Sequence, residues 1–450
     1  MNINNTIYAR KDGENENLVE LCAINYKFKY ILGLSNNYEK LNKTAVRIEF
    51  KGIELFNDKW REYMKNIEGL LIKKKREKLG LKQEYICKGI CSISYLSKIE
   101  KGNISASNEI IGLLFQKLGI KYNNDSKFIK NGKDILDYVS RTNYFGLTID
   151  DKVLEDIIYK REEYLNSPLY IDYRLFELSD KRYDIKDIDI IKYREYMTND
   201  QLYKAYFLTG FIKEDINMLE NAKRIKETAE VVNRIAYVKW IKGKYYESIE
   251  IYLEALSLAN IEGNIKEQID ICTMLGNIYM DIDIHTMQKY YDKALLLSNF
   301  SHNDEFKFLI YYHMGIAYTL IDFEKSELYL LEALRFCHEN DKISLEKLYQ
   351  KLCFLYLLYD KRKDVKYYYN KTKEINVSEE VNELIAIMIE NKNYISSNFY
   401  LNKLLDIYNH SKENNKHSDT KYYGDFLIEA YKSNRKYKYA LEVTDYLYRI

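Results

Sequence analysis

The chain has 450 residues, a net charge of +1 and a single proline, Pro168. Helix interiors exclude proline and tolerate few glycines, so this composition predicts an all-α protein long enough for two or three domains. No apolar run reaches the length of a membrane span, and the six cysteines form no CxxC pair. These features exclude a membrane helix and a disulfide framework, and we expect a cytoplasmic protein without membrane contact.

Residues 1–63 contain no motif, although the alternating stretch 44–51 is a candidate strand. Directly before Met64, the codons of Trp60-Arg61-Glu62 can form a purine-rich run similar to a ribosome-binding site. We therefore expect Met64 to be the native start and residues 1–63 to be an untranslated leader. The alternative is a translated N-terminal extension.

Residues 64–121 form a basic module with a net charge of +7, which leaves −6 for the remainder. A basic segment on a mildly acidic body indicates a polyanion-binding end. Within it, a first helix should run to about Lys78 and stop at Gly80, and a second should begin near Gln83. Ser92 and Ser107 are suited to cap a third and a fourth helix. Two short helices across a tight turn with packed flanking helices are typical of a helix-turn-helix.

The same module resembles the XRE/Cro-type helix-turn-helix family over about 55 residues. The resemblance lies in Gly69, Ile72, Arg76, Gly80-Leu81, Gln83 and the run from Ser94 to Gly102. Lys75 and Lys82 depart from the family pattern, the first at an apolar position and the second at a helix cap. The resemblance implies that Arg76 and Glu100 bridge the first and third helices.

The resemblance also implies a DNA-reading surface around the third helix. Its start would meet base edges or phosphates in the major groove, while Gln83, Ser97 and Lys101 would position the DNA backbone. The expected DNA-binding residues are Gln83, Ser92, Ile93, Ser94, Tyr95, Ser97, Lys98 and Lys101.

Residues 122–150 are expected to form a linker, and residues 151–450 a helical-repeat domain for sensing and dimerisation. Small residues recur every 39 positions at Ala255, Ala294 and Ala333, and Thr372 continues the series. Tyr290, Tyr329 and Tyr368 keep the same step, as do Gly276 and Gly315. Such a period predicts an α-solenoid, and its units resemble tetratricopeptide helix hairpins.

The first helix of each hairpin in such a solenoid lines the concave face, where asparagine amides suit capture of a peptide backbone. The expected peptide-binding residues are Asn233, Tyr237, Trp240, Asp270, Thr273, Asn277 and Tyr312.

A helix-turn-helix followed by tetratricopeptide-like repeats resembles the RRNPP family of peptide-responsive transcriptional regulators, which act in quorum sensing. The resemblance implies a homodimer, a double-stranded DNA operator and a short signalling peptide as partners. Two alternatives stay open: a helix-turn-helix scaffold whose repeats bind a protein partner, and a phage-type lysis–lysogeny regulator. There is no P-loop, GxGxxG or HExxH motif, and the six histidines are scattered, so we expect no enzyme, cofactor or metal site.

Overall fold

The computed structural model describes residues 6–7, 21–22, 67–180, 182–183, 189–280, 282–301, 304–414 and 416–447. The chain divides into two compact units, residues 1–62 and 63–450. The described residues of the first unit form two antiparallel strands, β1 (Thr6–Ile7) and β2 (Leu21–Cys22). The candidate strand at 44–51 and the expected start at Met64 lie outside the described residues.

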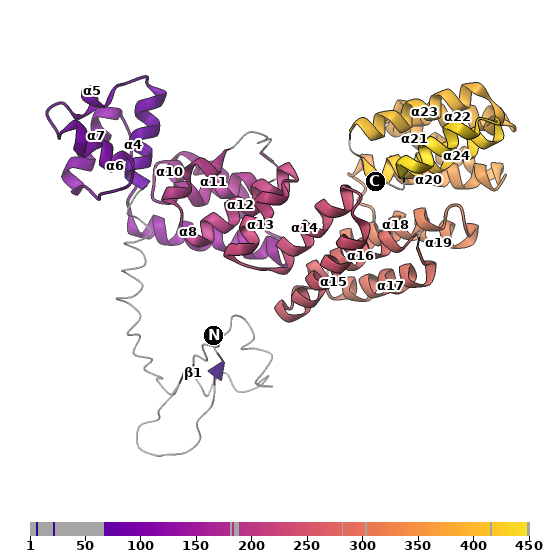
Figure 1. The fold of residues 1–450 in the computed structure, drawn as a ribbon, viewed down its shortest axis with the longest axis horizontal. Coiled ribbons are helices and arrows are strands. Elements are labelled where there is room, and N and C mark those ends of the chain that lie inside the picture. Colours follow the sequence, from indigo (N-terminus) through magenta and orange to yellow (C-terminus); the bar gives the residue numbers. More distant parts are fainter. Residues whose placement is uncertain are drawn as a thin grey trace, which may run out of the picture. The chain divides into compact units, whose positions relative to one another are not determined.

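The described part of the second unit begins with a group of short helices around one apolar core (Figure 1). They are α4 (Ile67–Lys78), α5 (Gln83–Cys87), α6 (Ile93–Glu100) and α7 (Asn108–Leu118). Ile72, Ile86, Leu96 and Leu114 contribute one residue from each helix to the core, and none of the four is exposed. The described group has the arrangement of a helix-turn-helix.

The ends of these helices follow the expected local signals. The Ser92 hydroxyl accepts a hydrogen bond from the amide of Tyr95 at 3.1 Å, and the Ser107 hydroxyl accepts one from Ile110 at 3.4 Å. Gly80 has a φ of +65°, which a glycine adopts without strain. The Lys82 side chain caps nothing, as its departure from the family pattern predicted.

Helix α4 crosses α6 so closely that the crossing point admits only glycine. A Cβ atom on Gly69 would lie 2.0 Å from the carbonyl oxygen of Ile99. This contact sets the distance between the first helix and the third, and it explains a glycine near the start of α4, where alanine would otherwise be favoured.

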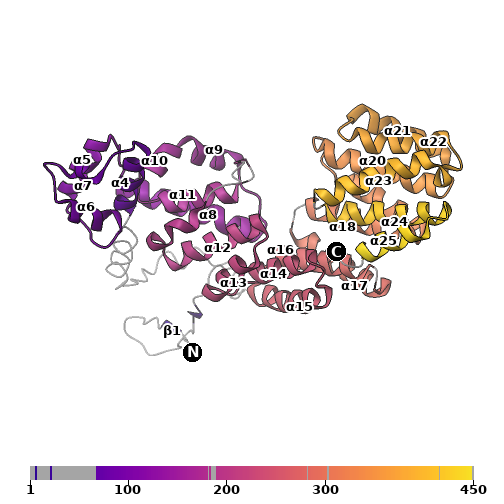
Figure 2. The same cartoon turned by 45° about the horizontal axis from the view of Figure 1, so that its top comes forward.

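The chain continues through a group of helices that contact one another and the helix-turn-helix (Figure 2). They are α8 (Ser126–Tyr144), α9 (Asp151–Tyr159), α10 (Arg161–Leu165), α11 (Tyr170–Ser179) and the 3-10 helix η1 (Ile190–Tyr196). Helix α8 occupies most of the predicted linker 122–150, and it packs against α11 with Leu136 and Val139 buried. The domain boundaries drawn from the sequence stay predictions.

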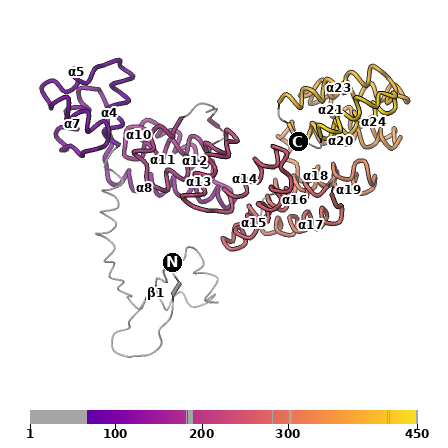
Figure 3. The backbone as a smooth tube through the Cα atoms, viewed as in Figure 1, coloured from indigo at the N-terminus to yellow at the C-terminus, as the bar shows by residue number. Residues whose placement is uncertain are grey.

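From residue 199 onward, helices that follow one another in the chain pack together in pairs, as the tube in Figure 3 traces. The first part comprises α12 (Asn199–Lys213), α13 (Ile216–Ile225), α14 (Ala229–Ile241), α15 (Tyr245–Glu262), α16 (Ile265–Tyr279), α17 (Ile284–Ser301), α18 (Asp304–Tyr318) and α19 (Phe323–Phe336). The second part comprises α20 (Lys342–Leu358), α21 (Arg362–Ile375), α22 (Glu379–Glu390), η2 (Tyr394–Ser396), α23 (Asn398–Glu413), α24 (His417–Ser433) and α25 (Tyr437–Leu447). This arrangement is consistent with the predicted helical-repeat domain.

The small residues that revealed the repeat lie where paired helices touch. Ala255, Ala294 and Ala333 are fully buried on α15, α17 and α19, the second helices of three successive pairs. A Cβ atom on Gly276 of α16 would lie 2.7 Å from the Tyr291 ring of α17. Small side chains therefore permit the close approach of the two helices in each pair, as the spacing predicted. Among the described residues, no helix is long and apolar enough to cross a membrane.

Candidate DNA-binding surface and candidate ligand face

Helix α6 presents the predicted reading residues to solvent. Ser92, Ile93, Ser94 and Lys98 are exposed, whereas Leu96 and Ile99 point into the core. Of the other predicted DNA-binding residues, Lys101 is exposed and Gln83, Tyr95 and Ser97 are half-buried. Ser92, Ile93 and Ser94 lie at the capped start of α6, whereas Lys98 and Lys101 lie at its other end.

A two-pronged ion pair joins α4 to α6. The Arg76 Nε atom donates to Glu100 Oε1 at 2.6 Å, and the Nη2 atom donates to Oε2 at 2.8 Å. The Arg76 Nη1 atom also donates to the carbonyl oxygen of Leu81 at 3.0 Å. The hydrogen bonds with Glu100 raise the pKa of Arg76 above its ordinary value. The predicted bridge between the first and third helices is thus present, and Arg76 also holds the connection between α4 and α5.

Gln83 belongs to the same cluster. Its Nε2 atom donates to Glu100 Oε2 at 2.7 Å. One of the two amide N–H groups is therefore engaged inside the domain, which leaves the second N–H as the side-chain donor that could reach a DNA phosphate.

Positive charge around the helix-turn-helix is largely uncompensated. Among the described residues, no carboxylate lies within ion-pair distance of Lys82, Lys88, Lys98 or Lys101, although Arg76 is fully paired with Glu100. All four lysines are exposed. Unpaired, exposed lysines such as these suit contacts with phosphates, which dominate DNA affinity.

The helix-turn-helix is joined to the helices that follow it by polar contacts that the sequence did not reveal. The Tyr196 hydroxyl of η1 donates to the backbone carbonyl of Glu100 at 2.5 Å, at the end of α6. The Lys74 ammonium donates to the Tyr170 hydroxyl of α11 and lies 4.5 Å from the ring centre. Burial, with a smaller contribution from Arg174, lowers the pKa of Lys74 to about 8.

The apolar core continues across the same junction. Tyr170, Ile171 and Leu175 of α11 pack in one cluster with Leu70 and Leu96 of the helix-turn-helix. The DNA-binding helices and the start of the helical body therefore share one core. A shift of α11 or η1 would change the packing around α6.

Among the repeat helices, α14 contacts α16 and α16 contacts α18, so the first helices of successive pairs lie side by side. Two of the predicted peptide-binding residues meet in one network there. Asn233 donates to Glu267 at 2.7 Å, and Lys266 bridges Glu267 at 2.6 Å and Asp270 at 3.3 Å. Desolvation, reinforced by Glu267, raises the pKa of the nearby Glu230 to about 8. This acidic cluster across α14 and α16 can accept hydrogen bonds from a ligand.

Tyr237 and Trp240 lie further along α14 and contact one another at 5.9 Å between ring centres. The Arg234 guanidinium stacks on Tyr237 at 4.2 Å and on Phe211 of α12 at 4.1 Å. Arg234 therefore links the Tyr237 ring to Phe211 of α12. Both aromatic residues are half-buried.

Thr273 and Asn277 of α16 make hydrogen bonds within the repeat. The Thr273 hydroxyl donates to the carbonyl of Ile269 at 2.8 Å, and the Asn277 amide oxygen accepts from Tyr291 of α17 at 2.6 Å. Only the Asn277 amide nitrogen remains, with a weak contact to a methionine sulfur at 3.9 Å. These two residues are less suited to a ligand than Asn233 and Asp270.

Tyr312 of α18 lies apart from the Asn233 network. Its ring stacks on Phe308 at 6.0 Å, and the Asp419 carboxylate of α24 helps to raise its pKa, after burial. Two residues that sequence reasoning missed belong to this neighbourhood. Lys351 of α20 is buried against the ring of Tyr422, whose pKa is raised by burial and then by neighbours that include Tyr423 and Tyr312. No spacing rule could have paired them, because they come from distant hairpins.

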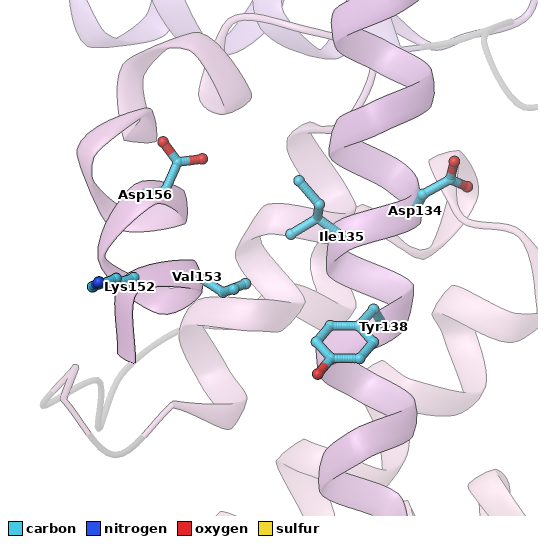
Figure 4. Close-up of a pocket in the computed structure, with 6 residues that line it drawn as sticks. All are labelled: Asp134, Ile135, Tyr138, Lys152, Val153 and Asp156. Carbon is cyan, nitrogen blue, oxygen red and sulfur yellow. The ribbon is translucent and has the colours of Figure 1, made fainter. Parts of the chain in front are cut away.

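A shallow pocket lies between α8 and α9, lined by Asp134, Ile135, Tyr138, Lys152, Val153 and Asp156. Figure 4 shows Ile135 and Val153 pointing into the space between the helices, whereas Asp134 and Lys152 point away from it. A ligand site needs several converging polar groups, which this pocket lacks. None of the predicted site residues lines it.

The described residues contain no group of three or more His, Cys, Asp or Glu side chains placed to hold a metal ion. Comparison with protein families matches residues 72–123 to a family described as Helix-turn-helix. No curated protein matches the chain. An XRE-type DNA-binding domain at 72–123 is thus followed by a long region of paired helices, and this domain suggests a DNA-binding transcriptional regulator.

Proposed function

We propose that the chain is a transcriptional regulator whose operator binding is controlled by a short peptide held by the first helices of its repeats. The observation that carries this proposal is the junction between the DNA-binding helices and the body. Tyr196 bonds the end of α6, and the apolar core runs from α6 into α11. A regulator needs such a physical link, because an effector acts only through states that differ at both sites.

On the DNA side, α6 enters the major groove with Ser94 and Lys98 facing the bases and phosphates. Ser92, Ile93 and Tyr95 lie beside them, and Lys101 and Gln83 contact the backbone at the two ends of the reading surface. The proposal includes a homodimer on a palindromic operator, since a single helix of this length reads only a few base pairs.

On the ligand side, Asn233 and Asp270 provide the most suitable groups. Their shared network with Glu267 and Lys266 holds donors and acceptors in fixed positions across α14 and α16. An extended peptide presents backbone amides and carbonyls that such a surface can bind. Trp240, further along α14, adds a half-buried aromatic surface.

DNA binding is tested by selecting bound sequences from randomised double-stranded DNA with the purified full chain. The expected result is one enriched motif with two inverted half-sites about one helical turn apart. Recovery of no enriched motif would overturn the assignment as an operator-binding regulator.

Peptide control is tested with peptides captured from a random heptapeptide library and then assayed individually by calorimetry. Asn233→Ala should weaken binding of a captured peptide by about tenfold while leaving DNA affinity in its absence unchanged. Asn260→Ala, which alters an exposed asparagine of α15, is the matched control. If the library yields no peptide, control by a peptide is wrong, whatever the outcome of the DNA selection.

A further inference from the structure

Lys351 is a buried cation without a hydrogen-bond partner. Its residue is 2% exposed, and no acceptor contacts its Nζ atom among the described residues. The ammonium lies 3.1 Å from the centre of the Tyr422 ring and 4.7 Å from that of Tyr423, both of α24. The Tyr422 hydroxyl is also buried without a partner. Two unsatisfied donors thus occur together in one place.

The rest of α20 shows that this is a local exception. Gln350 donates to Asn382 at 3.0 Å, and Asn382 donates to Glu346 at 2.9 Å. Glu346 also accepts the backbone amides of Val377 and Ser378. The helix therefore satisfies its other buried polar side chains, whereas Lys351 remains unsatisfied. Buried polar groups without partners are rare in native proteins, so each one is a candidate for a functional role such as ligand binding.

The groups around Lys351 define the charge that fits there. Lys347 is one turn earlier on the same face of α20, half exposed, with its Nζ atom 3.9 Å from Asp419. Burial lowers the pKa of Lys351 to about 7, Asp419 opposes this shift and Lys347 adds to it. After burial, the Asp419 carboxylate also helps to raise the pKa values of Tyr312, Tyr422 and Tyr423. Because Lys347 is paired with Asp419, an anion here would meet Lys351 as the cation without a carboxylate partner, together with the Tyr422 hydroxyl.

We propose that the Lys351 ammonium and the Tyr422 hydroxyl bind a carboxylate of the peptide ligand. This inference rests on the proposed function and adds the anchor by which the peptide is held. A carboxylate fits better than a phosphate, because one buried lysine balances a single negative charge and Asp419 would repel a dianion. The carboxylate is either the peptide C-terminus or an Asp or Glu side chain.

The position of the Tyr422 ring links carboxylate binding to the packing of α24. The ring covers one side of the ammonium, and a carboxylate bound to both the ammonium and the Tyr422 hydroxyl would shift it. Tyr422 belongs to α24, and Lys351 to α20 in the same apolar cluster. Binding therefore changes the packing of α24 against α20, which is the kind of two-state rearrangement that an allosteric ligand needs.

The test uses two random heptapeptide libraries that differ only in the C-terminus, one with free acids and one with amides. The full chain is incubated with each, and bound peptides are quantified by mass spectrometry. The wild-type chain should recover free acids at least about tenfold over amides, or recover amides enriched in Asp and Glu. The first result identifies the C-terminus as the carboxylate, and the second identifies a side chain.

Lys351→Met should remove that preference while the chain stays folded, because methionine fills the same apolar space without a charge. Tyr422→Phe keeps the ring and should reduce the preference severalfold. The matched control is Lys361→Met, since Lys361 lies 3.2 Å from the Phe323 ring centre but is exposed. Equal recovery of acids and amides without acidic enrichment would overturn the anchor alone. Recovery of no peptide from either library would overturn the proposed function together with it.

Discussion

The Arg76 guanidinium donates two hydrogen bonds of 2.6 and 2.8 Å to the Glu100 carboxylate, although the two residues are 24 positions apart in the chain. The side chain of Glu100 is 3% exposed and that of Arg76 is 13% exposed. The pair connects the first helix to the end of the reading helix. Its geometry makes it a structural element of the DNA-binding domain, outside the reading surface itself.

Arg76→Ala is expected to destabilise the helix-turn-helix by about 3–5 kcal/mol, because it leaves the buried Glu100 carboxylate without a counter-charge. The measurement is urea unfolding followed by fluorescence and circular dichroism. The control is Arg335→Ala, which removes a surface ion pair whose arginine side chain is 70% exposed and should cost less than about 1 kcal/mol. Similar losses for both variants would contradict a structural role for Arg76.

Gly69→Ala is expected to destabilise the domain by about 3 kcal/mol or more, since the new methyl group would lie 2.0 Å from the Ile99 carbonyl oxygen. Gly112→Ala is the matched control. Gly112 also lies within a helix, α7, and a Cβ atom there meets nothing within 4 Å, so this variant should gain up to about 1 kcal/mol. Thermal unfolding of the two variants should therefore shift in opposite directions, and a shift of the same sign would refute the tight crossing.

The sequence predicted those features that local chemistry determines. Ser92 and Ser107 cap their helices because a hydroxyl next to a helix start reaches an amide only three residues away. The 39-residue period of Ala255 and Ala294 follows the helix pairs, since the close approach of paired helices repeats with the hairpin. Both kinds of signal act over one helix or one hairpin.

The contacts that matter for regulation lie beyond that range. Tyr196 and the carbonyl of Glu100 are 96 residues apart, and no periodicity links them. Lys351 and Tyr422 meet because α24 packs in the same cluster as α20, which depends on how several hairpins stack. The predicted ligand residues show the same limit, because the bond from Tyr291 to Asn277 could not be read from helix-face positions.

Replacing Ser94 and Lys98 by alanine is expected to weaken operator binding by about ten- to a hundredfold, because one base contact and one phosphate contact are lost. Both side chains are exposed, so circular dichroism should be unchanged. Fluorescence anisotropy over a range of salt concentrations should also show a slope reduced by about one for Lys98→Ala. Lys130→Ala on α8 is the control and should keep the wild-type affinity. An unaltered affinity in the double variant would remove α6 from the DNA.

Tyr196→Phe tests the link between the body and α6, since it deletes the hydroxyl that donates to the Glu100 carbonyl and keeps the ring. The change in DNA affinity caused by a captured peptide should shrink by about fivefold, which corresponds to one hydrogen bond. Affinity for the peptide itself should hold, because Tyr196 is on η1 and the ligand groups are on the repeat helices. Tyr159→Phe, at a residue 88% exposed, is the control. An undiminished peptide response would place the coupling elsewhere.

Lys351 should make the free energy of unfolding of the chain rise with pH. Its folded-state pKa is about 7, below the ordinary value of 10.5. Between these values the unfolded chain binds a proton that the folded chain has lost, so the free energy of unfolding rises with pH from about 7 upward. The slope approaches about 1.4 kcal/mol per pH unit and vanishes below pH 7, where both states are protonated.

Lys74 and Lys421, whose pKa values burial lowers to about 8, act in the same direction, so the difference between variants isolates Lys351. Urea unfolding at pH 7 and pH 9 should give a smaller rise for Lys351→Met than for the wild type. Lys361→Met, at an exposed lysine, should keep the wild-type rise. At pH 7 and below, Lys351→Met should also be the more stable protein, since it no longer holds a charge without a counter-ion in the core. Parallel pH curves for Lys351→Met and the wild type would show that the ammonium is solvated, and the carboxylate anchor would lose its basis.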